Sequence, residues 1–299
     1  ADRVAVLRGG RKGAERPVAG TNRVELAALM VGRTVPESRR EPRTPGRVAL
    51  VLDEVRVQGQ AGRVGLKDVS LTVHEGEIVG IAGVSGNGQT SLAGMLAGTV
   101  RAEAGSASLF GVPLYRDPAG AVRAGVARVP EDRHHEGIVG TLSVGENLFL
   151  ETLRDNRIQR LGFLRFAALR ALAQDAIASF DIRCPGPDAP IRLLSGGNIQ
   201  KVILARGLGR DPKLVIACQP TRGLDVGAAA DVHRRLLEAR ARGVAVVLIS
   251  EDLDELLALS DRIAVMTRGR LLPAEPVESV TLEDLGLKMA GHAHRSDAA

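Results

Sequence analysis

The sequence predicts an α/β protein in which crossover helices cover a largely parallel β-sheet. Four short apolar runs have the length of buried strands: 77–82, 214–218, 244–249 and 263–266. They alternate with stretches of helical composition at 90–97, 227–241 and 252–259, and such alternation is typical of parallel sheets. The longest run is far shorter than the roughly 20 apolar residues that a membrane-spanning helix needs. We therefore expect no membrane span.

Two regions depart from this pattern. Residues 48–57 and 66–73 alternate between apolar and polar side chains, like antiparallel strands. Between residues 138 and 208 the pattern is helical throughout, most clearly at 144–153 and 166–180. We expect an antiparallel β subdomain before the parallel sheet and a helical subdomain inserted into it.

The composition indicates a folded chain. Of 299 residues, 44% are hydrophobic and 25% charged, which is enough for one large domain or two. Aromatic residues make up only 2%, so stacking platforms for single-stranded nucleic acid have little to be built from. The net charge of +5 arises from short, scattered basic clusters, which indicate a solvated surface rather than a nucleic-acid partner. Cys184 and Cys218 lack metal-ligand spacing, so we expect a reduced cytosolic chain without a metal site.

Part of the sequence occurs twice at one constant offset. Residues 1–7 match residues 260–266, and Gly10–Arg11 matches Gly269–Arg270, both at an offset of 259. The same offset carries Leu26, Met30 and Gly32 onto Leu285, Met289 and Gly291. A gapless offset held over some 30 residues indicates a repeat rather than a chance likeness of two strands.

The repeat suggests a division of the chain. We interpret residues 1–33 as the C-terminal remnant of a preceding copy whose body is missing, and 48–299 as a second copy. Residues 34–47, with three prolines and four arginines, are predicted to form an exposed linker. The helical subdomain is predicted at about 138–208.

A glycine-rich loop follows the predicted strand at 77–82. Its glycines have the spacing of the phosphate-binding pattern G-x-x-x-x-G-K-[ST], except that Gln89 stands at the Lys position. Such loops hold phosphates with backbone N–H groups and the positive end of the next helix. The predicted nucleotide-binding residues are Gly83, Gly86, Asn87, Gly88, Gln89, Thr90 and Ser91. Taken alone, the match fits a structural strand-to-helix turn about equally well.

Three further motifs, in order along the chain, resemble those of the ATP-binding-cassette family. Val129–Arg133, with Glu131 where Gln is usual, looks like the Q-loop region, and Pro220–Asp225 resembles the D-loop. The signature motif is resembled by Leu194, Ser195, Gly196, Gly197 and Asn198, followed by Gln200. The D-loop residues are Gly223, Leu224 and Asp225. The resemblance covers 48 to about 290 and implies a P-loop NTPase fold of the cassette type.

Two runs carry the resemblance further. Ala217–Asp225 and Ile249–Glu255 look like the second cassette of fused, two-cassette importers for simple sugars and nucleosides. In this family a Lys contacts the β- and γ-phosphates, a carboxylate helps hold Mg²⁺, a Glu positions water and a His lies near the γ-phosphate. The corresponding positions here are Gln89, Cys218, Gln219 and Glu251.

All four residue types expected for hydrolysis are therefore replaced. A neutral thiol does not substitute for a carboxylate on the hard cation Mg²⁺. Loss of one charge-stabilising group typically costs about 10²- to 10³-fold in rate. We expect no intact catalytic residue in this half and negligible hydrolysis by it alone, whereas Thr90 and the glycine amides leave nucleotide binding open.

The signature motif is complete, and the resemblance implies that it takes part in binding nucleotide. Two cassettes of this family dimerise head to tail, so that the signature of one covers the nucleotide of the other. Ser195, Gly196 and Gly197 are thus expected to complete the ATP site of the preceding cassette in the same polypeptide, with Mg²⁺ mainly at that site.

The resemblance also implies partners. We expect membrane permease subunits to contact the helical subdomain around 138–150, a substrate-binding protein to act indirectly, and the chain to lie at the cytoplasmic face of the membrane. The alternative is a soluble regulatory cassette that acts on ribosomes or DNA. Glu131 fits a metal or water contact and a capping or salt-bridge role equally well, and His134 with His135 fits a solvated loop better than a metal site.

Overall fold

The computed structural model describes residues 1–8, 11–21, 25–26, 29, 40–60, 62–153 and 155–291. The remaining positions, among them Met30, Gly32 and the first part of the predicted linker, lie outside the described residues. Within the described part, no helix is both long and apolar enough to cross a membrane.

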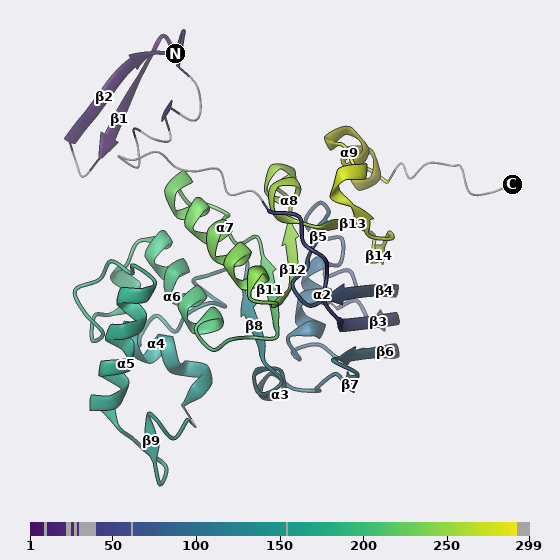
Figure 1. Cartoon of the computed structure of the whole chain (residues 1–299), viewed down its shortest axis with the longest axis horizontal. Coiled ribbons are helices and arrows are strands. Elements are labelled where there is room, and N and C mark those ends of the chain that lie inside the picture. Colours follow the sequence, from purple (N-terminus) through teal and green to yellow (C-terminus); the bar gives the residue numbers. More distant parts are fainter. Residues whose placement is uncertain are drawn as a thin grey trace, which may run out of the picture.

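A seven-stranded sheet forms the centre of the body (Figure 1). Its strands are β5 (Ile78–Ala82), β8 (Val126–Val129), β11 (Leu214–Cys218), β12 (Ala245–Ser250), β13 (Arg262–Thr267), β14 (Arg270–Leu271) and β15 (Glu275–Pro276). The order is β14-β13-β5-β12-β11-β8, with β15 on β13. Neighbours among β13, β5, β12, β11 and β8 run parallel. Every residue of β5, β11 and β12 is buried, because both faces of a parallel sheet are covered.

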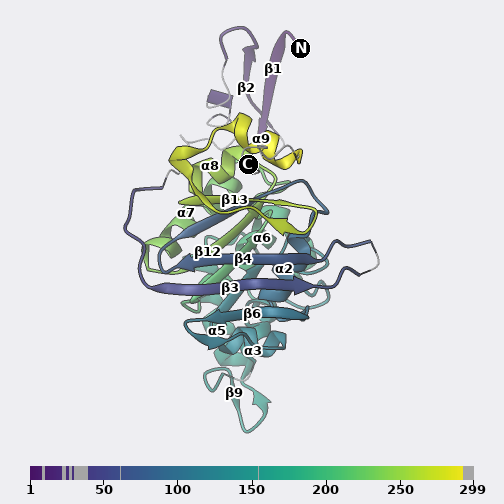
Figure 2. The ribbon, with the colours of Figure 1, turned by 90° about the vertical axis from the view of Figure 1, so that its right-hand side faces the viewer.

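A second, antiparallel sheet packs beside the first (Figure 2). It has the order β4-β3-β6-β7 and comprises β3 (Val48–Val57), β4 (Leu66–His74), β6 (Ala104–Leu109) and β7 (Val112–Pro113). Its apolar face, one face of the parallel sheet and the helix α2 (Gln89–Leu96) share one buried core. The opposite face of the parallel sheet forms the other core with the remaining large helices. The predicted antiparallel subdomain and parallel sheet are confirmed.

The other helices are α3 (Pro118–Arg123), α4 (Val144–Phe149), α5 (Phe166–Ser179), α6 (Gly196–Leu208), α7 (Val226–Ala241), α8 (Leu253–Leu259) and α9 (Leu282–Met289). Short 3₁₀ turns occur at Leu150–Thr152, Ile191–Leu193 and Val277–Ser279. The predicted helical insertion is present as α4, α5 and α6, with α4 ending earlier than expected. Asp225 and Asp252 cap α7 and α8 by accepting backbone N–H bonds.

The expectation of an all-helical insertion was wrong at one place. Residues 159–164 form a hairpin, with β9 (Gln159–Arg160) antiparallel to β10 (Phe163–Leu164). Leu161 and Gly162 form its turn with φ of 52° and 86°. Positive φ at both central residues is the geometry of a tight hairpin turn, and it is incompatible with continued helix.

The N-terminal hairpin has the same strand pairing as β13 with β14 and β15. It consists of β1 (Arg3–Arg8) and β2 (Arg11–Pro17) and extends away from the body (Figure 1). At an offset of 259, β1 corresponds to β13 residue for residue. The cross-strand pairs Arg3↔Pro17, Val4↔Arg16, Leu7↔Lys12 and Arg8↔Arg11 recur as Arg262↔Pro276, Ile263↔Glu275, Met266↔Leu271 and Thr267↔Arg270. Among the described residues β1 pairs only with β2, whereas β13 also pairs with β5.

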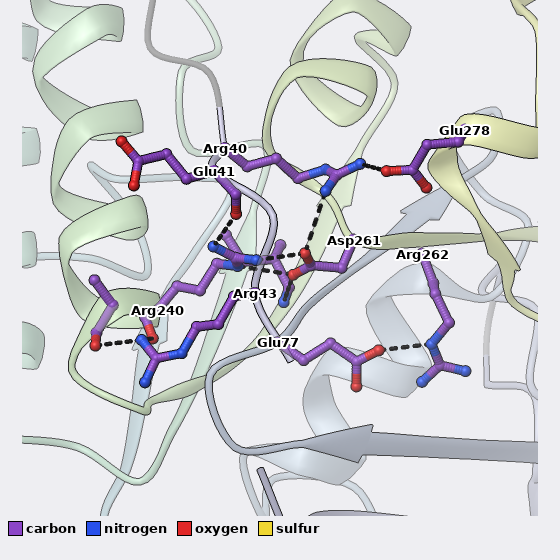
Figure 3. Close-up of polar contacts among 10 residues, drawn as sticks. Arg40, Glu41, Arg43, Glu77, Arg240, Asp261, Arg262 and Glu278 are labelled. Atoms are coloured by element: carbon purple, nitrogen blue, oxygen red, sulfur yellow. Dashed lines mark hydrogen bonds and ion pairs between the residues drawn. The ribbon is translucent and has the colours of Figure 1, made fainter. Parts of the chain in front are cut away.

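The described end of the linker is tied to the body by arginines (Figure 3). Residues 41–47 are exposed, as expected of a linker, but the Arg40 side chain is only 14% exposed. Arg40 forms ion pairs with Asp261 and Glu278. Arg240, which is 5% exposed, also binds Asp261, with Nε–Oδ2 and Nη2–Oδ1 distances of 2.8 and 2.6 Å.

Backbone groups complete this linker clamp, which we define as Arg40, Glu41 and Arg43 with their partners. Arg240 Nη1 donates to the Glu41 carbonyl at 3.0 Å. Arg43 donates to the carbonyls of Arg240 and Ala241 at the end of α7, where a cation is favoured by the helix dipole. The linker therefore has a defined attachment at the start of β13 and the end of α7 (Figure 3).

Candidate functional site

The glycine-rich loop connects β5 to α2, as predicted from its flanking residues. Gly86 and Gly88 have φ of 86° and 115°, in the left-handed region that glycine adopts without strain. A Cβ on Gly83 would lie 2.6 Å from the Met266 carbonyl oxygen, so the chain there has no room for a side chain. The loop thus has the backbone that a phosphate cradle requires.

Gln89 bonds to the loop instead of extending from it. Its side chain is buried, and its Oε1 accepts from the Asn87 N–H at 3.0 Å while its Nε2 donates to the Val84 carbonyl at 3.0 Å. Asn87 adds a bond from Nδ2 to the same carbonyl at 2.9 Å and accepts the Arg268 N–H at 2.8 Å. Ser91 donates its hydroxyl to the Val64 carbonyl. The loop is held by its own side chains.

The structure brings the four replaced positions into one pocket. Gln89, Cys218, Gln219 and Glu251 all line it, together with Ser85, Gly86, Thr90, Ala93, Arg128, Glu131, Glu136 and Ile249. Burial raises the pKa of the Cys218 thiol to about 12, so the thiol is neutral at physiological pH. Gln219 accepts the Glu251 N–H at 3.2 Å. The sequence placed these residues together correctly, although their roles stay predictions.

Arg128 and Glu136 were not predicted as pocket residues. Arg128 lies in β8 between apolar neighbours, and it forms an ion pair with Glu136. A charged residue inside a short apolar strand was the available signal. Glu131 also has a partner, because Arg222 forms an ion pair with it. Glu131 was expected to contact metal or water, or to cap a helix or form a salt bridge, and the structure contains the salt bridge.

The pocket residues do not fit a hydrolytic Mg²⁺ site. Two of the three carboxylates, those of Glu131 and Glu136, are already paired with arginines, and the thiol is neutral. In the part of the chain that is described, no group of three or more His, Cys, Asp or Glu side chains is arranged to hold a metal ion. Carboxylate and water oxygens are the usual ligands of Mg²⁺.

The signature segment lies at the N-terminus of α6. Ser195 is exposed at the N-cap position, and no side-chain hydrogen bond caps the helix. The Asn198 side chain holds Ser195 by donating from Nδ2 to its Oγ at 2.9 Å, and accepts the Arg183 N–H at 2.8 Å. The first N–H groups of α6 have no acceptor within the helix, and the Ser195 hydroxyl beside them is exposed.

The signature, the D-loop and the Glu131 segment form one connected group. Gln200, 2% exposed, donates to the Pro220 carbonyl at 2.7 Å. Arg133 Nη2 donates to the carbonyls of Arg222 and Gly223 at 2.8 and 3.3 Å. Leu194 packs against the core, the Leu224 N–H bonds to the Thr221 carbonyl, and Asp225 caps α7. These bonds fix the predicted motifs relative to one another.

Residues 66–222 match the ABC transporter family. Because this match covers more than half of the chain, the protein belongs to that family. It is 40% identical to the guanosine import ATP-binding protein NupO of Bacillus subtilis, over 98% of this chain and 58% of NupO. It is 39% identical to the nucleoside import ATP-binding protein NupA of Lactococcus lactis, over 97% of this chain and 58% of NupA. The chain thus spans a little over half the length of these relatives.

A solved structure supports the fold alone. A dimeric ATP-binding cassette in a post-hydrolysis state, bound to ADP and Pi, superposes with a TM-score of 0.65 at 22% identity, covering 77% of this chain and 100% of that one. The cassette fold, with its antiparallel subdomain and helical insertion, is confirmed.

Proposed function

We propose that this chain is the ATP-binding part of an importer for nucleosides or simple sugars, and that it acts as the second of two cassettes in one polypeptide. The relatives named for guanosine and nucleoside import support the substrate class. Their greater length supports a further cassette, as does the repeated pairing register of β1 with β2 at an offset of 259. Import relatives do not favour the alternative of a soluble regulatory cassette.

In this proposal the signature segment completes the ATP site of the preceding cassette. The observation that carries it is the asymmetry of the chain: α6 presents Ser195 and an uncapped N-terminus, while the chain's own pocket lacks the residue types for hydrolysis. Backbone N–H groups at a helix N-terminus, with a hydroxyl beside them, bind phosphate oxygens. Asn198 orients the Ser195 hydroxyl, and Gln200 ties the same helix to the D-loop.

In this proposal the chain's residues position the ATP of the preceding cassette and do not themselves catalyse its hydrolysis. ATP would be bound between the signature segment and the glycine loop of the preceding cassette, and that cassette would supply the Mg²⁺ ligands. The inserted helices α4–α6 would receive the permease subunits at the cytoplasmic face of the membrane, with a substrate-binding protein acting through the permease. No nucleic acid takes part.

The test compares two substitutions in the full-length protein assembled with its membrane subunits. Gly196→Asp places a carboxylate against the γ-phosphate and is expected to lower ATPase activity and transport by about 10²- to 10³-fold, the cost of losing a well-placed charge-stabilising contact. A Cβ at Gly196 meets only ordinary contacts, 3.5 Å from Arg133 Nε, and an acidic residue at a helix start stabilises the helix. The fold should therefore persist.

Gln219→Ala, in the chain's own pocket, is the matched control and is expected to change both rates by less than about twofold. Phosphate release at saturating ATP and uptake of labelled nucleoside measure the two effects. The opposite ranking, with Gln219→Ala inactive and Gly196→Asp active, would place hydrolysis at this chain's own loop and overturn the proposal.

A further inference from the structure

The chain's own loop already contains an oxygen acceptor at one of its N–H groups. Gln89 Oε1 accepts from the Asn87 N–H at 3.0 Å, and Gln89 Nε2 lies 2.6 Å from the position of a Cβ on Gly83. A Lys at this position has three donors and no acceptor, so it could not take that N–H. The carboxamide oxygen of Gln89 thus accepts one N–H of the loop, as a phosphate oxygen would.

Among the described residues that line it, the pocket has no unpaired cation for a polyphosphate. The pocket is lined by three carboxylates, Glu131, Glu136 and Glu251, against one guanidinium, Arg128. Arg128 is already paired with Glu136, so an anion would have to compete with that carboxylate for the guanidinium. The three carboxylates are exposed and therefore screened by solvent, so what the pocket lacks is a cation to offset the charge of the phosphates.

The pocket also offers nothing for a base to stack on. None of its lining residues, all of them in the described part of the chain, is aromatic. The chain's only tyrosine, Tyr115, donates its hydroxyl to the Leu96 carbonyl at the far end of α2. Stacking on aromatic rings is a principal source of affinity for nucleobases.

From these three observations we infer that this cassette's own pocket does not take a nucleoside triphosphate, and that Gln89 replaces the phosphate as the internal support of the loop. The inference deepens the proposed function of the same protein. A closed pair of cassettes then holds one ATP, at the site that the signature segment completes, rather than two.

Calorimetric titration of residues 1–299 with MgATP, and with ATP in EDTA, tests the inference. The wild-type chain is expected to show no saturable binding up to about 1 mM, a concentration at which a site with a Kd of 1 mM would be half filled. The double variant Gln89→Ala, Glu251→Gln frees the Asn87 N–H and removes one carboxylate, and it is expected to bind at least tenfold more tightly than that limit. Glu283→Gln, an exposed carboxylate on α9, controls for charge alone and should resemble the wild type.

Saturable wild-type binding at one site per chain would overturn the inference. Absence of binding by both wild type and double variant, with both chains folded by circular dichroism, would overturn the role assigned to Gln89. Counting the ATP retained by the full-length protein gives a second measurement, for which one per polypeptide is expected and two contradicts the inference. These results are separable from the proposed function, because a loss of transport in Gly196→Asp stands whatever the count.

Discussion

The glycine loop at 83–91 and the signature segment at 194–200 each contain the N-terminus of a helix without a side-chain cap, yet a carboxamide bonds differently in each. In the loop, Gln89 turns inward and bonds Asn87 and Val84. In the signature segment, Asn198 bonds the exposed Ser195 hydroxyl at the surface. A helix N-terminus alone therefore does not define a phosphate site. The nearby polar groups must also be exposed, and not already hydrogen-bonded to side chains of the same loop.

The largest expected difference between the two regions is in the rate of ATP hydrolysis. Residues 1–299 are expected to release no phosphate above a denatured control, and Gln89→Lys is expected to leave release at that level because Cys218, Gln219 and Glu251 remain. A coupled phosphate assay with and without Mg²⁺ measures both. If the single substitution gave steady release of about one per second or faster, the loop would be competent and the contrast between the two regions would disappear.

A smaller effect concerns the two cysteines, Cys218 in the pocket and Cys184 in the segment before the signature. Cys218 lines the pocket, and burial raises the pKa of its thiol from 9.0 to about 12, whereas Cys184, which follows the Arg183 bonded to Asn198, is half-buried. Since only the thiolate reacts, iodoacetamide at pH 8 should modify Cys184 at least tenfold faster than Cys218, and the Cys218 rate should rise only as the pH approaches 12. Peptide mass spectrometry of native and denatured chain separates the two sites. Equal rates in the native chain would show that the pocket contains a charged thiol.

The smallest expected effect is on stability. Gln200→Leu removes the buried bond to the Pro220 carbonyl and leaves that oxygen unpaired, which should lower the free energy of unfolding by about 1–3 kcal/mol. Gln58→Leu, at an exposed position, is the matched control and should cost far less. Denaturant unfolding followed by circular dichroism gives both values. An equal effect of the two substitutions would mean that the tie between signature and D-loop does not support the fold.

The elements that were predicted correctly are those whose limits are marked by residues next to them in the sequence. The strands at 48–57 and 214–218 were predicted to the residue, because charged or polar neighbours limit both apolar runs. The hairpin at 159–164 was missed because each of its strands is only two residues long, too short to show an alternating pattern, and its apolar residues Leu161 and Phe163 are largely exposed. The turn at Gly162 was its only local signal.

The sequence predicted which residues lie together in the site, but not which hydrogen bonds and ion pairs they form. Motif order placed Gln89, Cys218, Gln219 and Glu251 together, and the structure has them in one pocket. Whether Gln89 faces the pocket or the loop depends on the position of Asn87 and Val84 around it, and the pairing of Arg222 with Glu131 joins residues 91 positions apart. Such contacts follow from the folded backbone, and neither periodicity nor spacing encodes them.

The linker clamp has a mechanical consequence. Arg40 and Arg43 attach to Asp261, Glu278 and the carboxyl end of α7, all in the α/β body, and none of their described bonds reaches the inserted helices α4–α6. If the insertion turned as a rigid unit against the sheet, the anchor point of the linker would not shift. The described end of the linker is therefore attached to the same body that carries the glycine loop, and not to the inserted helices.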